Sequence, residues 1–253
     1  MLKKMDIFNT NSDNKHTLEL NSTAKGMLHK YISNDGGYYY KSGFCDEYGD
    51  YEDHSVIAEC IAYEMGKELG LNVLKQQLVY YHDILACKSK NFLEDDENIV
   101  TFAQMGISTY KDMEERLSEH IKYFNSILIF DFIINNKDRH LNNIGLIKNH
   151  SGIYREPPIF DNGSSLFYDL SRKQLTYIAN HTNGHKKYDS AKPFCRKHYN
   201  QIDLVFNNGI LPDLNLDIDI DSIVCKYYQG ARYFAITRSI KERLEYVKQL
   251  YKR

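Results

Sequence analysis

One polar stretch constrains this chain more than any other, residues 130–145, which read Phe-Asp-Phe-Ile-Ile-Asn-Asn-Lys-Asp-Arg-His-Leu-Asn-Asn-Ile-Gly. It begins as the end of an apolar helical run and leads into an apolar, strand-like run, Ile144–Ile147. Solubility does not require so many aspartates, asparagines and basic side chains between two buried segments. A short loop between core elements is a common way to aim catalytic side chains, so we expect a reaction centre here.

Length and charge limit the classes of protein that fit. A chain of 253 residues can bury a large core, as one large domain or two small ones. The formal net charge of −2 predicts neither direct nucleic-acid binding nor membrane binding. No apolar run is long enough to span a bilayer, the N-terminus lacks a signal-peptide pattern, and the five cysteines are odd in number and scattered. We therefore expect a cytoplasmic protein with reduced thiols, with delivery to a host cell left open.

Residues 1–92 predict a small β-rich lobe with one helix. Gly36-Gly37 before an aromatic run indicates a turn entering a strand, and Lys41 lies at the end of that strand. Apolar residues at helical spacing predict a helix over 55–69, with Gly70 as its C-cap. Two further strands are expected at 77–81 and 84–87, joined by a turn at His82-Asp83.

Residues 93–253 predict a larger, mainly helical lobe within the same single domain. The polar residues 88–98 read as a surface loop or connector, and residues 170–200 are polar and basic with little periodicity. The elements expected in this half are a long helix over 111–134, a hairpin of 144–147 with 153–160, and helices over 216–229 and 231–251.

Three polar residues have the spacing of a phosphoryl-transfer site. Asp138 and Asn143 are five residues apart, and Asp161 follows at the end of a strand, before Asn-Gly. Phosphoryl transfer requires a carboxylate near the attacking hydroxyl, together with hard oxygen ligands for Mg²⁺. Asp-(four residues)-Asn followed by Asp-x-Gly is also the spacing of the protein-kinase catalytic loop and metal aspartate. Upstream, Lys41 and Glu59 suit a phosphate-binding lysine and the carboxylate that orients it.

These motifs resemble a known family. Residues 133–145 and 158–164, with the helix from Glu59 to Val73, are similar to the HipA-like serine/threonine kinases, and among the small members to the CtkA-type kinases. The resemblance covers roughly residues 31–250. It implies an α+β, two-lobed protein-kinase-like fold that uses ATP and Mg²⁺ to phosphorylate Ser or Thr of a protein substrate, autophosphorylation included. Some members are toxins with an antitoxin-type partner protein, and some act on host cells.

The resemblance also assigns roles to residues. It implies that Asp138 and Asn143 are catalytic, that Asn143 and Asp161 bind the metal, and that Lys41, supported by Glu59, binds the ATP phosphates. We expect Asn135, Arg139 and His140 to shape the loop, and Asp131 to act as a structural cap. The pair Gly36-Gly37 departs from a G-x-G-x-x-G loop, so it leaves open how the phosphates are held.

Other readings stay open at this point. The incomplete glycine loop favours a kinase-fold module that binds nucleotide or a partner without turnover. Asp-Arg-His-x-x-Asn also resembles the catalytic loop of phosphoinositide kinases, which favours a lipid or small-molecule kinase. The spacings His181-(three)-His185 and Cys195-(two)-His198 occur in zinc sites, but paired thiols are absent and lysines intervene, so a basic surface segment fits better.

Overall fold

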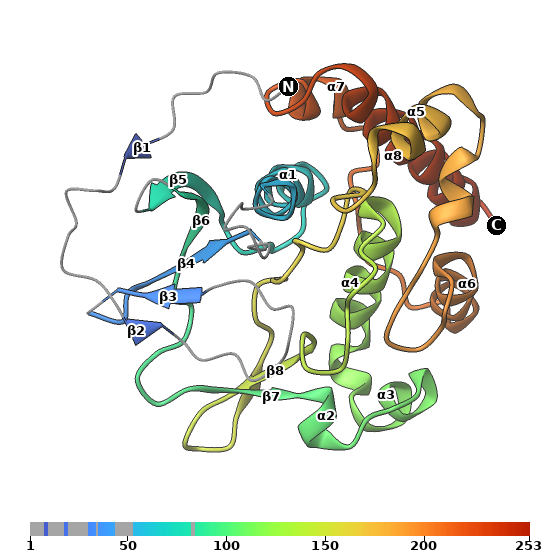
Figure 1. The fold of residues 1–253 in the computed structure, drawn as a ribbon. Helices are drawn as coiled ribbons and strands as arrows, with labels where there is room; N and C mark the ends of the chain where they lie inside the picture. Colours follow the sequence, from blue (N-terminus) through green and yellow to red (C-terminus); the bar gives the residue numbers. More distant parts are fainter. Residues whose placement is uncertain (1–7, 10–17, 20–29, 34, 44–52, 82–83) are drawn as a thin grey trace.

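The computed structural model describes residues 8–9, 18–19, 30–33, 35–43, 53–81 and 84–253. A β-sheet built from the N-terminal part stands beside a helical C-terminal part, and helix α1 (His54–Glu68) lies between them (Figure 1). The predicted α+β, kinase-like division into a sheet region and a helical region is confirmed.

Six strands of the described residues form the first sheet, in the order β1-β5-β6-β4-β3-β2. Their bounds are β1 Phe8–Asn9, β2 Leu18–Glu19, β3 Lys30–Ile32, β4 Tyr38–Ser42, β5 Gln77–Tyr81 and β6 Ile84–Lys90. The turn before β4 uses Gly36 at φ +69°, a conformation that glycine adopts without steric cost. The predicted strands are confirmed, and the turn predicted at His82-Asp83 lies outside the described residues.

Helix α1 forms where the apolar spacing predicted it. Its apolar positions are buried, and it packs against β5 and β6. Gly70 follows it at φ +81°, as expected of a glycine that ends a helix. A Cβ at Gly66 would lie 2.2 Å from Val73 Cγ2, so only a glycine lets the exit segment fold back across the helix.

The exit of α1 is tied to the segment that carries Asp161. Val73 forms a parallel bridge with Ile159, the Ile159 amide donates to Asn72 O at 2.7 Å, and the Leu74 amide donates to Ile159 O at 2.9 Å. Ile159 lies two residues before Asp161. These backbone bonds therefore fix the candidate metal aspartate relative to α1.

A second sheet holds the other end of the catalytic loop. It has the order β7-β8-β9, with bounds Asn98–Thr101, Gly145–Lys148 and Tyr154–Arg155. The predicted hairpin is confirmed, but its second strand is shorter than expected. The loop expected over 88–98 is wrong at both ends, because β6 continues to Lys90 and β7 begins at Asn98. A Cβ at Gly145 would lie 2.3 Å from Val100 O, so this pairing requires glycine.

The single helix predicted over 111–134 is broken into two. The elements here are α2 (Phe102–Met105), α3 (Tyr110–Arg116), a 3₁₀ turn (Ser118–His120) and α4 (Ile121–Ile134). Tyr110 donates a hydrogen bond to Asn125 Oδ1 at 2.8 Å. In one continuous helix their Cα atoms would be about 22 Å apart, so the break at Leu117 lets α3 fold back onto α4. Helix α4 is buried on nearly all sides, as its apolar composition requires.

The remaining helices are α5 (Arg172–Asn180), a 3₁₀ turn (Gly184–Tyr188), α6 (His198–Asn208), α7 (Ile220–Val224) and α8 (Gly230–Tyr251). The final helix is confirmed. Residues 170–200, whose sequence shows little periodicity, nevertheless contain α5 and the start of α6. The helix predicted over 216–229 is shorter than expected and forms only as α7. Among the described helices, none combines the length and apolarity needed to cross a bilayer.

Candidate active site

A lysine and two carboxylates meet between the sheet and α1. Lys41 Nζ on β4 donates to Glu59 Oε1 on α1 at 2.6 Å and also to Asp161 Oδ1. The Glu59 side chain is 1% exposed and that of Lys41 13% exposed, so water screens these contacts weakly. Three residues predicted from widely separated parts of the sequence are therefore brought into direct contact.

Charge in this cluster is maintained by pairing. Burial favours the neutral form of both Lys41 and Asp161, but their ion pair outweighs it. As a result, the pKa of Lys41 is raised above its ordinary value and the pKa of Asp161 is lowered below its own. Both groups are charged at neutral pH, which is the state that binding of phosphate and metal requires.

The residues after Asp161 lie against α1. The Asn162 amide donates to Glu59 Oε2 at 3.0 Å, so Glu59 binds both Lys41 and the Asp-Asn-Gly segment. A Cβ at Gly163 would lie 3.2 Å from Ser55 O, which is closer than a Cβ atom usually approaches a neighbour. Asp161 itself has φ +60°, which is uncommon for a residue with a side chain and needs support from its surroundings.

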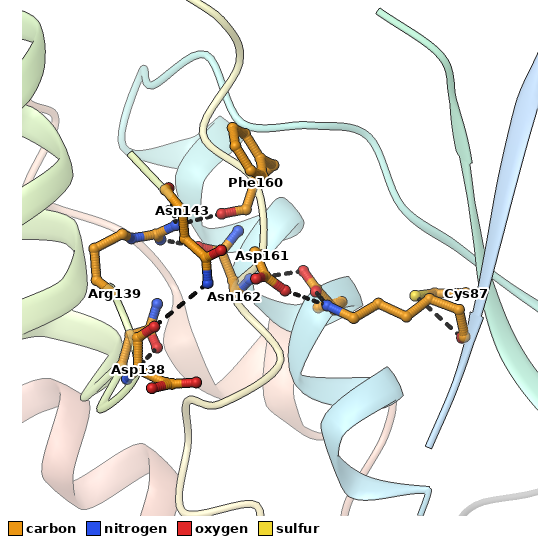
Figure 2. Close-up of polar contacts among 10 residues, drawn as sticks. Cys87, Asp138, Arg139, Asn143, Phe160, Asp161 and Asn162 are labelled. Carbon is orange, nitrogen blue, oxygen red and sulfur yellow. Dashed lines mark hydrogen bonds and ion pairs between the residues drawn. The ribbon is translucent and has the colours of Figure 1, made fainter. Parts of the chain in front are cut away.

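Arg139 joins the catalytic loop to that segment. Its Nε and one terminal nitrogen donate to the two Asp131 oxygens, both at 2.9 Å, in a fully buried ion pair. The same guanidinium donates to Asn143 O at 3.3 Å, to Asn162 Oδ1 at 2.6 Å and to Phe160 O. One buried side chain thus holds both halves of the two-part motif together (Figure 2).

Asp138 and Asn143 lie beside the hydrogen-bond network of Arg139, where the site is accessible to solvent. Figure 2 shows their side chains near Arg139, with Asp161 and Asn162 close by. Asn143 Nδ2 donates a long bond of 3.5 Å to Asp138 O, and the Asp138 amide donates to Asn136 Oδ1 at 3.2 Å. The Asp138 side chain is 43% exposed, so a hydroxyl of another molecule can reach it.

The neighbouring loop residues have structural contacts. Asn135 takes a left-handed conformation at the end of α4 and accepts from Arg243, and His140 Nδ1 accepts the Asn142 amide. The role predicted for Asp131 as a cap is wrong, because its carboxylate accepts from Arg139 and from Asn136 Nδ2 instead. Its partner is eight residues away across a loop, which helix spacing does not predict.

The turn at Gly36-Gly37 is not a phosphate cradle of the usual kind. The Asp35 carboxylate accepts the Gly37 amide at 2.9 Å and the Ser33 hydroxyl at 2.5 Å. The Gly37 amide in this turn therefore already donates to an anionic side chain. The structure agrees with the sequence here, since the pattern departs from G-x-G-x-x-G.

The sequence predicted no role for two further residues of the site. Asn162 Oδ1 accepts a hydrogen bond from Arg139, and Lys192 Nζ donates to Asp138 Oδ1 at 2.7 Å. Lys192 lies 54 residues from Asp138, so only the fold reveals the contact. No metal-binding group of three or more His, Cys, Asp or Glu forms within the described ranges, and His185 instead contacts Tyr199.

The donor types present suit Mg²⁺. Asp161 offers a carboxylate and Asn143 a side-chain amide oxygen, both hard oxygen ligands. Mg²⁺ is commonly held by one or two such protein ligands together with water and nucleotide phosphates. The residues therefore fit this ion, and they provide none of the thiolate or imidazole ligands that zinc prefers.

Comparison with known proteins places the chain. A family model described as HipA-like kinase matches residues 20–198. No curated protein matches. The Helicobacter pylori proinflammatory kinase CtkA has the same fold, with a TM-score of 0.68 and 16% identity over 89% of this chain and 94% of that one. A Shewanella oneidensis MR-1 toxin–antitoxin structure, which holds HipA, HipB and their operator DNA, gives a TM-score of 0.47 and 15% sequence identity. That match covers 99% of this chain and 69% of the other. Because the family model spans most of its length, this chain belongs to the HipA-like kinases, a family of ATP-using serine/threonine protein kinases.

Proposed function

We propose that this chain transfers the γ-phosphate of ATP to a serine or threonine hydroxyl of a protein substrate, with Mg²⁺ as its metal. The observation that supports this most is the convergence of Lys41, Glu59 and Asp161 beside the pair Asp138 and Asn143. Residues 1–92 would serve as the lobe that contacts the nucleotide phosphates, and residues 93–253 as the lobe that carries the catalytic loop.

We assign each residue the role that the family resemblance implies and that its contacts support. Lys41 would bind the nucleotide phosphates, and Glu59 holds its ammonium group in position. Asn143 and Asp161 would hold Mg²⁺, which neutralises charge on the phosphates when bound. Asp138 would orient the acceptor hydroxyl and accept its proton.

The reaction balances without any other reactant. The hydroxyl oxygen forms a bond to the γ-phosphorus as the bond between that phosphorus and the bridging oxygen breaks. ADP leaves, and the hydroxyl proton passes to Asp138. The substrate protein and an antitoxin-type partner stay predictions of the family resemblance.

Transfer of label from γ-labelled ATP to proteins of a cell lysate tests the proposal. The wild-type chain should label protein, and Asp138→Ala and Asp161→Ala should lower the rate by at least about 100-fold. Asp203→Asn, which removes an exposed carboxylate on α6, is the matched control and should label as the wild type does. Equal labelling by all four, or label found on lipid or metabolite alone, would contradict the proposal.

A further inference from the structure

The contact between Lys192 and Asp138 belongs to no predicted role. Lys192 lies in the segment 189–197, between the 3₁₀ turn and α6, and its Nζ donates to Asp138 Oδ1 at 2.7 Å. Both side chains are about half exposed, at 52% and 43%. A cation therefore sits at the carboxylate assigned to the acceptor hydroxyl, on the side open to solvent.

The backbone around Lys192 is held by buried groups. Gln201, 1% exposed, donates from Nε2 to Lys192 O at 3.0 Å and accepts the amides of Phe194 and Cys195. At the start of the segment, Asp189 accepts the His198 amide at 3.0 Å. The side chain is exposed, but the loop that presents it is fixed by polar contacts within the core.

The same core residue fixes this segment and the catalytic loop. Arg243 on α8, fully buried, donates to Asp189 Oδ1 at 2.9 Å and to Asn135 Oδ1 at 2.7 Å. Asn135 ends α4 three residues before Asp138. Arg243 thus sets the position of the Lys192 segment relative to the catalytic aspartate.

The ion pair itself is too weak to act as a lock. Ion pairs between exposed side chains shift an equilibrium by about fivefold at most, and salt weakens them further. Release of Lys192 from Asp138 would therefore oppose substrate binding very little. The contact therefore places an ammonium group at the reaction centre through an ion pair that substrate binding can replace.

Other basic groups around Asp138 have other contacts. Lys137 pairs with Asp169 and lies 4.8 Å from the centre of the Tyr168 ring, and Arg139 is buried in its own network. Lys41 approaches from the sheet side, where it contacts Glu59 and Asp161. Charge on the transferring phosphoryl group is spread over its oxygens, and cations on both sides of it lower the barrier.

We propose that Lys192 is a further catalytic residue, which leaves Asp138 when substrates bind and contacts the transferring phosphoryl oxygens from the acceptor side. This inference rests on the proposed function. In the step itself, the hydroxyl oxygen bonds to the γ-phosphorus, the bond to the ADP oxygen breaks, and the proton goes to Asp138. Lys192 remains an ammonium group throughout.

The first test compares Lys192→Met, Lys192→Arg and Arg196→Met with the wild type in the transfer assay. Lys192→Met should lower kcat by about 100-fold with a much smaller change in the KM for ATP. Lys192→Arg should recover a large part of the rate, since it keeps the charge. Arg196→Met removes an exposed cation from the same segment and should change neither value. Wild-type or faster transfer by Lys192→Met would overturn the inference.

The second test does not depend on turnover. Binding of ADP alone, and of ADP with aluminium fluoride as a mimic of the transferring group, is measured by calorimetry with Mg²⁺. Lys192→Met should lose affinity for the fluoride complex and keep that for ADP. Equal loss for both, or no loss, would overturn the role of Lys192, whereas a wild type that binds the mimic but transfers nothing would count against the proposed function alone.

Discussion

At the scale of single residues, Arg139 is the structural centre of the site. It is fully buried and has five donors, and its contacts link Asp131 on α4 with Asn143 and with the segment Phe160–Asn162. A lysine has one ammonium group and cannot reach so many acceptors in fixed directions. The backbone segments that carry Asn143 and Asp161, which we assign to the metal, are therefore held in place by an arginine that takes no part in the chemistry.

Replacement of Arg139 by methionine should destabilise the fold by about 3–5 kcal/mol, because it leaves the buried Asp131 carboxylate without its cation. Urea-induced unfolding measures this change. The double variant Arg139→Met/Asp131→Leu should recover much of the loss, since it removes both buried charges. A loss below about 1 kcal/mol in the single variant would contradict the role given to this pair.

The sequence predicted the site residues that belong to a motif of recognisable spacing. Lys41, Glu59 and Asp161 were predicted from their order and neighbours, and they are in contact. The partners of Asp131 and of Asp138 were not predicted, because Arg139 and Lys192 reach them across a loop and across 54 residues. Such pairs depend on how α4, α8 and the segment 189–197 pack, and no local pattern encodes that packing.

At the scale of elements, apolar residues at helical spacing predicted α1 and α8, and both helices form. The break between α3 and α4 carries neither glycine nor proline and is fixed by tertiary contacts. α5 did have a local signal, a capping box in which Ser171 and Gln174 bond reciprocally. The polar composition of residues 170–200 leaves few apolar residues at helical spacing, so the helix after this cap was not predicted.

Asn125 is the polar residue that sets the packing of α3 against α4. It accepts from Tyr110 and donates to Asn208 Oδ1 at 3.1 Å and to Ile210 O at 2.8 Å, so it joins three parts of the helical region. Tyr110→Phe should cost about 1–3 kcal/mol, since a buried acceptor loses its donor. Chemical denaturation measures this loss in the free energy of unfolding. The kcat should stay unchanged, because the substitution lies outside the candidate active site. A stability equal to that of the wild type would indicate that the fold-back of α3 does not need this bond.

At the scale of the whole molecule, buried histidines make the stability depend on pH. Burial, reinforced by the positive charge of Arg243, lowers the pKa of His185 to about 3 and that of His198 well below its ordinary value. Below about pH 6.5 the unfolded chain takes up protons that the folded chain does not. Stability should therefore fall as the pH drops from 7 to 5, with a slope that approaches about 1.4 kcal/mol per pH unit for each histidine once the pH is below 6.5.

His198→Leu should remove its share of that slope. The free energy of unfolding in urea, measured at pH 7 and at pH 5, gives the comparison, with His181→Gln as the control at an exposed position. The control should keep the wild-type slope. If His198→Leu kept it too, the neutral, buried state assigned to His198 would be wrong.

The molecule as a whole is a HipA-like kinase whose sheet region contacts α1 and the Asp161 segment through Lys41, Glu59 and Asp161. Mass spectrometry of phosphopeptides, after the chain and ATP are added to a cell lysate, tests this account most directly. We predict new phosphoserine or phosphothreonine sites with the wild type and with Asp203→Asn, and none with Asp138→Ala. An identical set of phosphopeptides from the wild type and Asp138→Ala would contradict the account.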